Sequence, residues 1–217
     1  MLDQDNELPQ TLSYFILNKL RWRIIVGDLL PGQALREVEI QSHYGSSRGP
    51  VRESLRLLLQ HGLVEHQQRR GFRVKSYPEK ETRDLYTLRA SLEGSAISSL
   101  KDRDLTELCR TLMARLQLME AHWNNKDRDG YFRENVVFHQ NIINFTENQP
   151  LIRVLHIVNE ISLPLRYNAI RLQWPKRTQL EYHFHIAEYL GKGDLEPARQ
   201  LTEEHILSNI HSIPSDT

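Results

Sequence analysis

Apolar residues recur every three or four positions at the start of the chain, and glycine and proline interrupt the pattern. Residues 12–26 have this spacing, and the segment 27–32 (GDLLPG) ends the helix that they predict. A shorter helix is expected over about 36–44, with Val38, Ile40 and Tyr44 as its buried side. Two helices therefore precede the stretch that carries the strongest pattern.

That stretch begins after a turn at Gly45 and predicts a third helix from about Ser47 to the stop at Gly62. Its apolar residues, expected to pack on the first two helices, are Leu55, Leu58 and Leu59. Two short extended runs, 63–66 and 71–75, flank a polar tip at 67–70 and predict a β-hairpin. Three helices followed by a hairpin predict a winged helix-turn-helix.

The second half of the chain has helical periodicity without a convincing strand signal. Tyr77-Pro78 is the expected linker, and caps and turn residues separate the helices expected at 79–99, 103–125, 129–145, 149–170, 176–191 and 195–211. The predicted fold class is mainly α, with a winged helix-turn-helix over 8–76 and an all-helical bundle over 80–211.

Composition limits the class of protein. The 217 residues are 39% hydrophobic and 26% charged, as in ordinary soluble domains, and no apolar run is long enough to span a bilayer. One cysteine excludes an internal disulfide, and the acidic N-terminus lacks a signal-peptide core, so we expect a cytoplasmic protein without a membrane partner. The net charge is zero, but it divides into +3 for residues 1–76 and −3 for residues 77–217, which suits an N-terminal half that meets an anion.

The third helix starts with groups that suit double-stranded DNA. Arg48 and Arg52 are four residues apart and share a face, and arginine can both bind guanine bidentately and neutralise phosphate. The candidate DNA-binding residues are Arg36, Ser47, Arg48, Gly49, Arg52, Arg69, Arg70 and Gly71, the last three at the hairpin tip. The alternative is a solvated, charged face of an interaction module.

Residues 24–74 resemble the N-terminal domain of the GntR family of bacterial transcription regulators. The matching segments are PG (31–32), LRE (35–37), SRGPVRESL (47–55), GLV (62–64) and the wing glycine, Gly71. The resemblance implies that Arg36, Arg48, Arg52 and Gly71 contact operator DNA. Gly49 replaces the usual threonine and is expected to affect which operator is read.

Histidines are the chemically interesting residues of the helical half. Asn135 and His139 share one helix face, and His183 and His205 lie on later helices. Three imidazoles and an amide oxygen converging inside a bundle could hold a divalent metal with open positions. The alternative is that these are ordinary surface or core histidines, and His185, two residues from His183, faces elsewhere on its helix.

Residues 80–211 resemble the FCD ligand-binding domain of FadR-type GntR regulators. The matching segments are 85–96, 135–151 and the spacing from His183 to His205. The resemblance implies a divalent metal (zinc, nickel or manganese) held by Asn135, His139, His183 and His205. Many relatives have aspartate at position 135, and the neutral amide is a weaker ligand; the adjacent Glu134 points about 100° away on a helix.

Arg89 lies where related proteins commonly offer an arginine to the effector. A guanidinium beside a metal can bind both oxygens of a carboxylate, so a small organic acid is the expected effector. The alternative is an ordinary surface ion pair between Arg89 and Glu93. Arg166 and Asn168 are further candidates for the pocket lining.

Together these patterns predict a ligand-responsive bacterial transcription regulator, a repressor rather than an activator, that binds a palindromic operator as a homodimer. It is not expected to be an enzyme. One alternative is a metal-responsive regulator in which the ion itself is the effector. The other, a metal-dependent hydrolase fused to a DNA-targeting module, lacks a general base at a defensible position.

Overall fold

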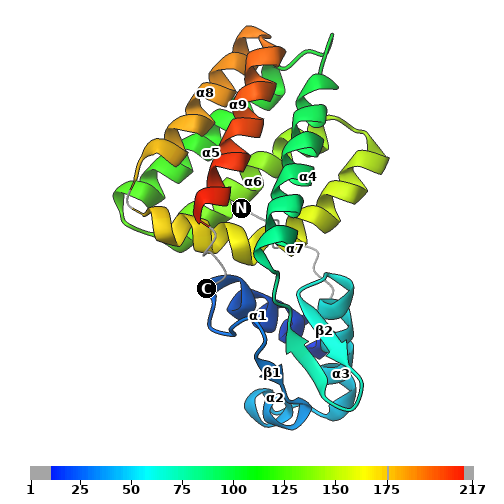
Figure 1. Ribbon diagram of the computed structural model, residues 1–217. Helices are drawn as coiled ribbons and strands as arrows, with labels where there is room; N and C mark the ends of the chain where they lie inside the picture. The colour runs from blue at the N-terminus through cyan, green and yellow to red at the C-terminus, as the bar shows by residue number, and fades with distance from the viewer. Residues whose placement is uncertain (1–10, 175, 213–217) are drawn as a thin grey trace. The chain divides into compact units, whose positions relative to one another are not determined.

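The computed structural model describes residues 11–174 and 176–212, and the chain divides into two compact units at Tyr77 and Pro78 (Figure 1). The elements of the first unit are α1 (Leu12–Val26), β1 (Ala34–Leu35), α2 (Glu37–Tyr44), α3 (Arg48–Gln60), β2 (Val64–Gln67) and β3 (Gly71–Val74). Those of the second are α4 (Glu79–Ser98), α5 (Thr106–Asn124), α6 (Arg128–Phe145), α7 (Gln149–Gln173), α8 (Thr178–Lys192), α9 (Leu195–Ser208) and the 3-10 turn η1 (Asn209–Ser212). The predicted winged helix-turn-helix followed by a helical domain is confirmed.

The first unit is built around one apolar core that joins the helices to the sheet. The core residues of α1 and α3 include Ile16, Leu20, Val51, Leu55 and Leu58, all almost fully buried, and α2 adds Ile40. The hairpin β2–β3 pairs antiparallel and places Phe72 and Val74 against this core. The sequence did not predict β1, whose two residues add to the other edge of β3 by pairing with Arg73 and Phe72. A two-residue strand is too short to show a periodicity.

Two expected core positions were wrong. Val38 is 76% exposed and only Ile40 of α2 is buried, because residues two apart on a helix point about 200° away from each other. Leu59 is 40% exposed, whereas Leu55 and Leu58 are fully buried. The turn between α2 and α3 is as expected: Gly45 has a left-handed backbone with φ 59°, and Ser47 occupies the N-cap position of α3.

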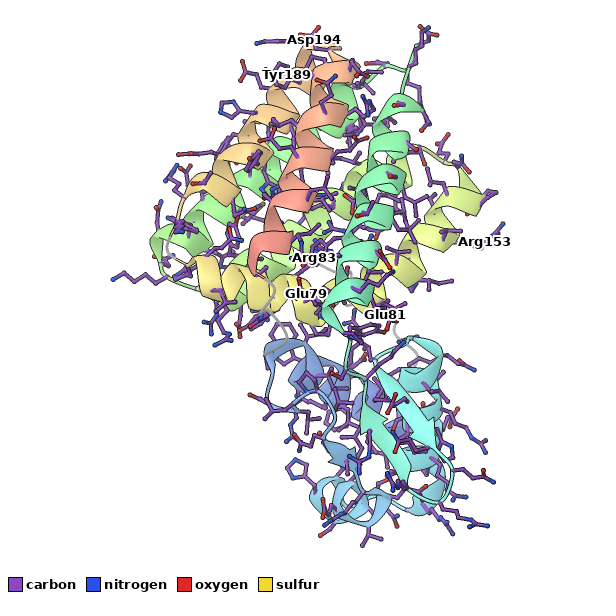
Figure 2. All side chains as sticks on the ribbon, viewed as in Figure 1. Glu79, Glu81, Arg83, Arg153, Tyr189 and Asp194 are labelled. Atoms are coloured by element: carbon purple, nitrogen blue, oxygen red, sulfur yellow. The ribbon has the colours of Figure 1, made fainter. Side chains whose placement is uncertain are left out.

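The second unit consists of the six helices α4 to α9 and the turn η1. Helices α4 and α9 pack side by side and run antiparallel, with α8 next to α9 and α5 against α6 and α8 (Figure 1). Figure 2 shows Glu79, Glu81 and Arg83 at the start of α4, at the opposite end of this unit from Tyr189 and Asp194 at the α8–α9 turn. None of the described helices is long and apolar enough to cross a membrane.

The helix boundaries of the second unit differ slightly from those expected. Helix α5 begins at Thr106, because the backbone N–H of Arg103 closes the preceding turn onto Leu100 and Asp104 accepts hydrogen bonds from the backbone and side chain of Thr106. Helix α7 continues to Gln173 despite containing Pro164. These shifts leave the predicted histidine positions on α6, α8 and α9, inside the bundle.

Candidate functional site

The start of α3 presents two arginines to solvent. The side chains of Arg48 and Arg52 are 65% and 46% exposed, and each donates a hydrogen bond from Nε to the carboxylate of Glu37 on α2, at 3.1 and 3.0 Å. Gly49 lies between them, is exposed, and has open space where a Cβ would stand. Ser47 is exposed, and its side chain makes no capping hydrogen bond.

The wing contributes further basic groups. Arg69 and Arg70 are exposed at the hairpin tip, and Arg69 and Gly71 both have positive φ values, 64° and 76°. A groove of about 280 Å³ separates α3 from the wing and is lined by Glu37, Arg52, Arg56, Leu59, His66 and Phe72. Arg36 is exposed too, but it pairs with Glu39 at 2.8 Å rather than with the arginines of α3. The structure thus places exposed basic groups at the start of α3 and at the tip of the wing, and of these candidates Arg52 lines the groove.

Three of the four expected metal ligands converge in the second unit. His139 of α6, His183 of α8 and His205 of α9 are buried, and each offers one ring nitrogen within 4.8 Å of those of the other two. Nε2 of His139 and Nε2 of His183 are 3.2 Å apart. Residues separated by more than sixty positions in the sequence therefore form one cluster.

The partners of the two closest imidazoles determine their tautomers. Nδ1 of His139 lies 2.8 Å from the Glu93 carboxylate, and Nδ1 of His183 lies 2.6 Å from the Gln179 carbonyl oxygen. Both partners are acceptors, so we assign the proton of each ring to Nδ1. The two Nε2 atoms then carry lone pairs that face each other. This arrangement is repulsive in itself and is the one in which histidines bind a metal ion, with the other nitrogen held by a fixed acceptor.

The charges of the surrounding groups agree with this assignment. Burial raises the pKa of Glu93, but the charge of Arg89 and the hydrogen bond from His139 outweigh it, and the net shift of that pKa is strongly downward. Burial lowers the pKa of His139, although the nearby Glu93 opposes the shift. The pKa values of His183 and His205 lie well below the ordinary histidine value, because of burial and of the neighbouring imidazoles. The three rings are therefore neutral near pH 7, which is the form that metal ligands need.

Asn135 does not present its oxygen to the cluster. Its Nδ2 lies 2.9 Å from Nε2 of His183, while its Oδ1 accepts a hydrogen bond of 2.9 Å from Nη2 of Arg166. Turning the amide over would bring Nδ2 against the guanidinium, so the network determines this orientation. Asn135 can offer its oxygen to a metal only by giving up the bond to Arg166. Burial, together with the charge of Arg89, lowers the pKa of Arg166 to about 9.

A small cavity adjoins the cluster. Its volume is about 20 Å³, and it is lined by Arg89, Tyr131, Asn135, His139, Arg166, Ile170, Gln179, His205 and Asn209. Three buried polar atoms of this lining, Nη2 of Arg89, the Tyr131 hydroxyl and Nδ1 of His205, have no hydrogen-bond partner among the described residues. Buried polar atoms are usually paired, so three unpaired ones among the residues of a single cavity point to an occupant. The space suits one water molecule or one ion.

The structure decides between several alternatives for single residues. Arg89 does pair with Glu93, at 2.8 Å, but both side chains are almost fully buried, so this is not the surface bridge that the sequence left open. Arg166 lines the cavity, whereas Asn168 does not and instead accepts hydrogen bonds from Arg171. His185 is exposed beside Glu188.

Sequence reasoning missed three groups at this site. The spacing of Arg89 and Glu93 indicates only an ion pair between them, the local pattern holds no signal for Tyr131, and the Gln179 carbonyl is detectable from its position four residues before His183. Glu134 points away from the site, as expected, and pairs with Arg115.

Comparison with known proteins identifies the family. Residues 12–74 match the sequence model of the gntR family of bacterial regulatory proteins, and residues 84–208 match that of the FCD domain. The chain belongs to the GntR family and carries an FCD domain. The family and the relatives of this GntR protein are transcriptional regulators and not enzymes. This excludes the alternative of a metal-dependent hydrolase fused to a DNA-targeting module.

Similar proteins cover most of the chain. The uncharacterized HTH-type transcriptional regulator YdhC of Bacillus subtilis is 29% identical over 95% of this GntR protein and 90% of its own length. The repressor GlaR of Escherichia coli is 26% identical (89% and 93% covered), and the gluconate operon repressor of Bacillus licheniformis is 28% identical (76% and 65% covered).

Solved structures share the fold. Escherichia coli McbR/YncC superposes with a TM-score of 0.77 at 19% identity, covering 93% of this chain and 96% of its own. Lar of Listeria monocytogenes superposes with a TM-score of 0.65 at 22% identity, covering 95% and 98%. At these identities the similarity shows the fold alone.

Proposed function

We propose that this GntR-family protein is a repressor that binds a palindromic operator as a homodimer and responds to a small carboxylate bound in the FCD domain beside a divalent metal. The metal would be held by His139, His183 and His205, with Asn135 as a fourth ligand. The arginines of α3 and of the wing would bind the DNA. Repression is supported by the relatives that are named as repressors.

One observation carries the metal part of the proposal. Nε2 of His139 and Nε2 of His183 lie 3.2 Å apart while both Nδ1 atoms face acceptors. Two neutral imidazoles with facing lone pairs attract a positive charge, and His205 offers a third ring nitrogen within 4.8 Å of theirs. A divalent cation would supply this charge and would attract an anionic ligand.

The same residues support a carboxylate as effector. Arg89 uses Nε for Glu93 and Asn159 and leaves Nη2 unpaired; Tyr131, whose hydroxyl is also unpaired, lines the same cavity. Both groups donate hydrogen bonds and would be satisfied by carboxylate oxygens. Gluconate, after which the operon of one relative is named, is itself a carboxylate.

The size of the cavity gives effector binding a structural consequence. A space of about 20 Å³ holds one small occupant, so an organic acid can enter only if the lining moves. The lining comes from α4, α6, α7, α8, α9 and η1. An effector that binds only a displaced arrangement of these helices would shift the population of that arrangement and so change DNA binding.

The cavity also favours the alternative in which the ion itself is the effector. A titration of DNA binding separates the two. A duplex selected from a randomised library would be bound by the metal-free protein, by protein with Zn²⁺, Ni²⁺ or Mn²⁺, and by the metal-loaded protein with a series of small carboxylates. We expect the largest change in affinity on addition of a carboxylate to metal-loaded protein; a full response to metal alone would favour the alternative.

Asn135→Asp is expected to tighten metal binding by about 10- to 100-fold, the range typical of changes around a metal site. A carboxylate can keep one oxygen on Arg166 and direct the other toward His183, where the amide now directs N–H. Without metal this second oxygen would face a lone pair, so the metal-free variant should melt at a lower temperature than the wild type. Competition with a chelator measures the affinity.

Asn168→Asp is the matched control for this variant, because Asn168 lies outside the cavity lining and is bonded by Arg171. It should leave metal affinity unchanged. An Asn135→Asp variant that binds metal no better than the wild type would contradict the placement of residue 135 among the ligands.

A further inference from the structure

A single carboxylate connects the two arginines at the start of the recognition helix. Glu37 is the first residue of α2, and its two oxygens lie 3.0 Å from Nε of Arg52, while one of them lies 3.1 Å from Nε of Arg48. Arg48 and Arg52 are one helical turn apart on α3, so the contact joins the two helices of the helix-turn-helix. Glu37 was not among the candidate DNA-binding residues.

The atoms used in these contacts leave the other edge of each guanidinium available. Glu37 occupies Nε in both cases, and neither guanidinium has another hydrogen bond within the described part of the chain. The two Nη groups can therefore bind O6 and N7 of guanine together, the commonest specific contact of arginine in the major groove. A carboxylate on Nε also fixes the rotation of the guanidinium plane, which a free, long side chain does not.

Glu37 is itself held in place. Its side chain is only 22% exposed, and its position in the first turn of α2 lets the helix dipole stabilise its negative charge. Partial burial raises the pKa of Glu37, but the hydrogen bonds from Arg52 and Arg48 outweigh it, and the net shift is downward. The carboxylate is therefore ionised at neutral pH and available to both arginines.

We propose, resting on the DNA-binding role proposed above for the arginines of α3, that Glu37 is a positioning residue that sets the DNA sequence preference of the protein by orienting Arg48 and Arg52 for base contacts. Its charge has a second effect. A negative group in the basic face weakens the attraction of phosphates, which carry most non-specific affinity. Glu37 thus favours base reading over indiscriminate backbone binding, and the two effects act in opposite directions on specific and non-specific complexes.

The opposite directions make the proposal testable with the full-length protein. The affinity of each variant is measured for a duplex selected from a randomised library by the wild type, and for a scrambled duplex of the same length and composition. Glu37→Gln should bind the scrambled duplex a few-fold more tightly and should prefer the selected duplex about tenfold less, the order expected for losing one well-oriented arginine–guanine contact. A general structural defect would instead weaken both complexes.

Two further variants separate charge from orientation. Glu37→Asp keeps the charge but shortens the side chain, so it should lose preference without gaining affinity for the scrambled duplex. Glu53→Gln removes a charge of the same sign from α3, where Glu53 accepts a hydrogen bond from Ser13 and contacts neither arginine. Glu53→Gln should therefore bind the scrambled duplex more tightly and keep the wild-type preference for the selected duplex.

Retention of the wild-type preference by both Glu37 variants would overturn the proposal, as would an equal loss of affinity for both duplexes.

Discussion

Replacing His139 and His183 together by alanine is expected to abolish metal binding. The two residues contribute the facing Nε2 atoms, 3.2 Å apart, and removing both leaves His205 without a second imidazole. Metal at a hundredfold excess over its dissociation constant should stabilise the folded wild type by about 2.7 kcal/mol. The same metal concentration should not stabilise the double variant. Elemental analysis after dialysis and the shift of melting temperature on adding metal provide the two measurements.

The control removes two histidines from the same helical unit without touching the cluster. His156 and His185 are exposed, on α7 and α8, so His156→Ala with His185→Ala should keep both the bound metal and the thermal shift. If the alanine double variant does not fold, the double variant His139→Gln with His183→Gln takes its place, because glutamine keeps most of the side-chain volume. Full metal occupancy in a folded double variant would show that the ligands are elsewhere.

Replacing Arg52 by alanine is expected to lower the affinity for a selected operator duplex on the order of 100-fold. One bidentate arginine–guanine pair discriminates by roughly 1–3 kcal/mol, and a homodimer would lose one such pair in each half-site. Affinity for a scrambled duplex should fall far less, since only one of several phosphate-neutralising groups is lost. Footprinting and competition with scrambled DNA measure the two affinities, and circular dichroism checks the helix content.

Lys19→Ala is the charge-matched comparison. Lys19 is exposed on α1 and lies over the ring of Phe15, so its removal takes one positive charge from the same unit without changing α3. It should reduce both affinities slightly and equally. An unchanged footprint of Arg52→Ala would remove α3 from the role of recognition helix.

The two sites use their charged groups differently. Around Glu37 the arginines of the ion pairs are largely exposed, so the pairs contribute little to folding, and we propose that they orient the groups that meet DNA. Around Glu93 the charges of Arg89 and Glu93 are fully buried, so each depends on the other to remain ionised. The unpaired atoms left over in the buried network, and not its ion pair, are what indicate a ligand.

Local sequence signals were sufficient for the architecture of the first unit. Apolar residues at helical spacing, the glycine at position 45 and the hairpin flanked by short extended runs are properties of neighbouring residues, and the helices and strands follow them. The exceptions were also local: β1 was too short to detect, and Val38 could not share a face with Ile40. In the second unit the helices were placed by the same signals, with boundaries shifted by a few residues.

The candidate site depended on more than local signals. His139, His183 and His205 were singled out by their positions on helices and by resemblance to a known family, but the chain contains ten histidines, and spacing could not show that these three are buried together. Glu93 lies 46 residues before His139, and Arg166 lies 31 residues after Asn135, so neither contact leaves a trace in the local pattern.

The sequence by itself determined which segments are helices, that a hairpin follows the first three of them, and that a basic helix start precedes a histidine-bearing bundle. These properties follow from hydrophobic periodicity, capping residues and composition, which act over a few positions. Only the tertiary structure decided that Glu37 accepts hydrogen bonds from both Arg48 and Arg52 and that Asn135 turns its N–H toward His183. It alone also gave the volume of the cavity beside the histidines, about 20 Å³. The physical reason is that side-chain direction and the volume left between helices are set by packing among distant segments, and hydrogen bonds form only where that packing brings donors to acceptors.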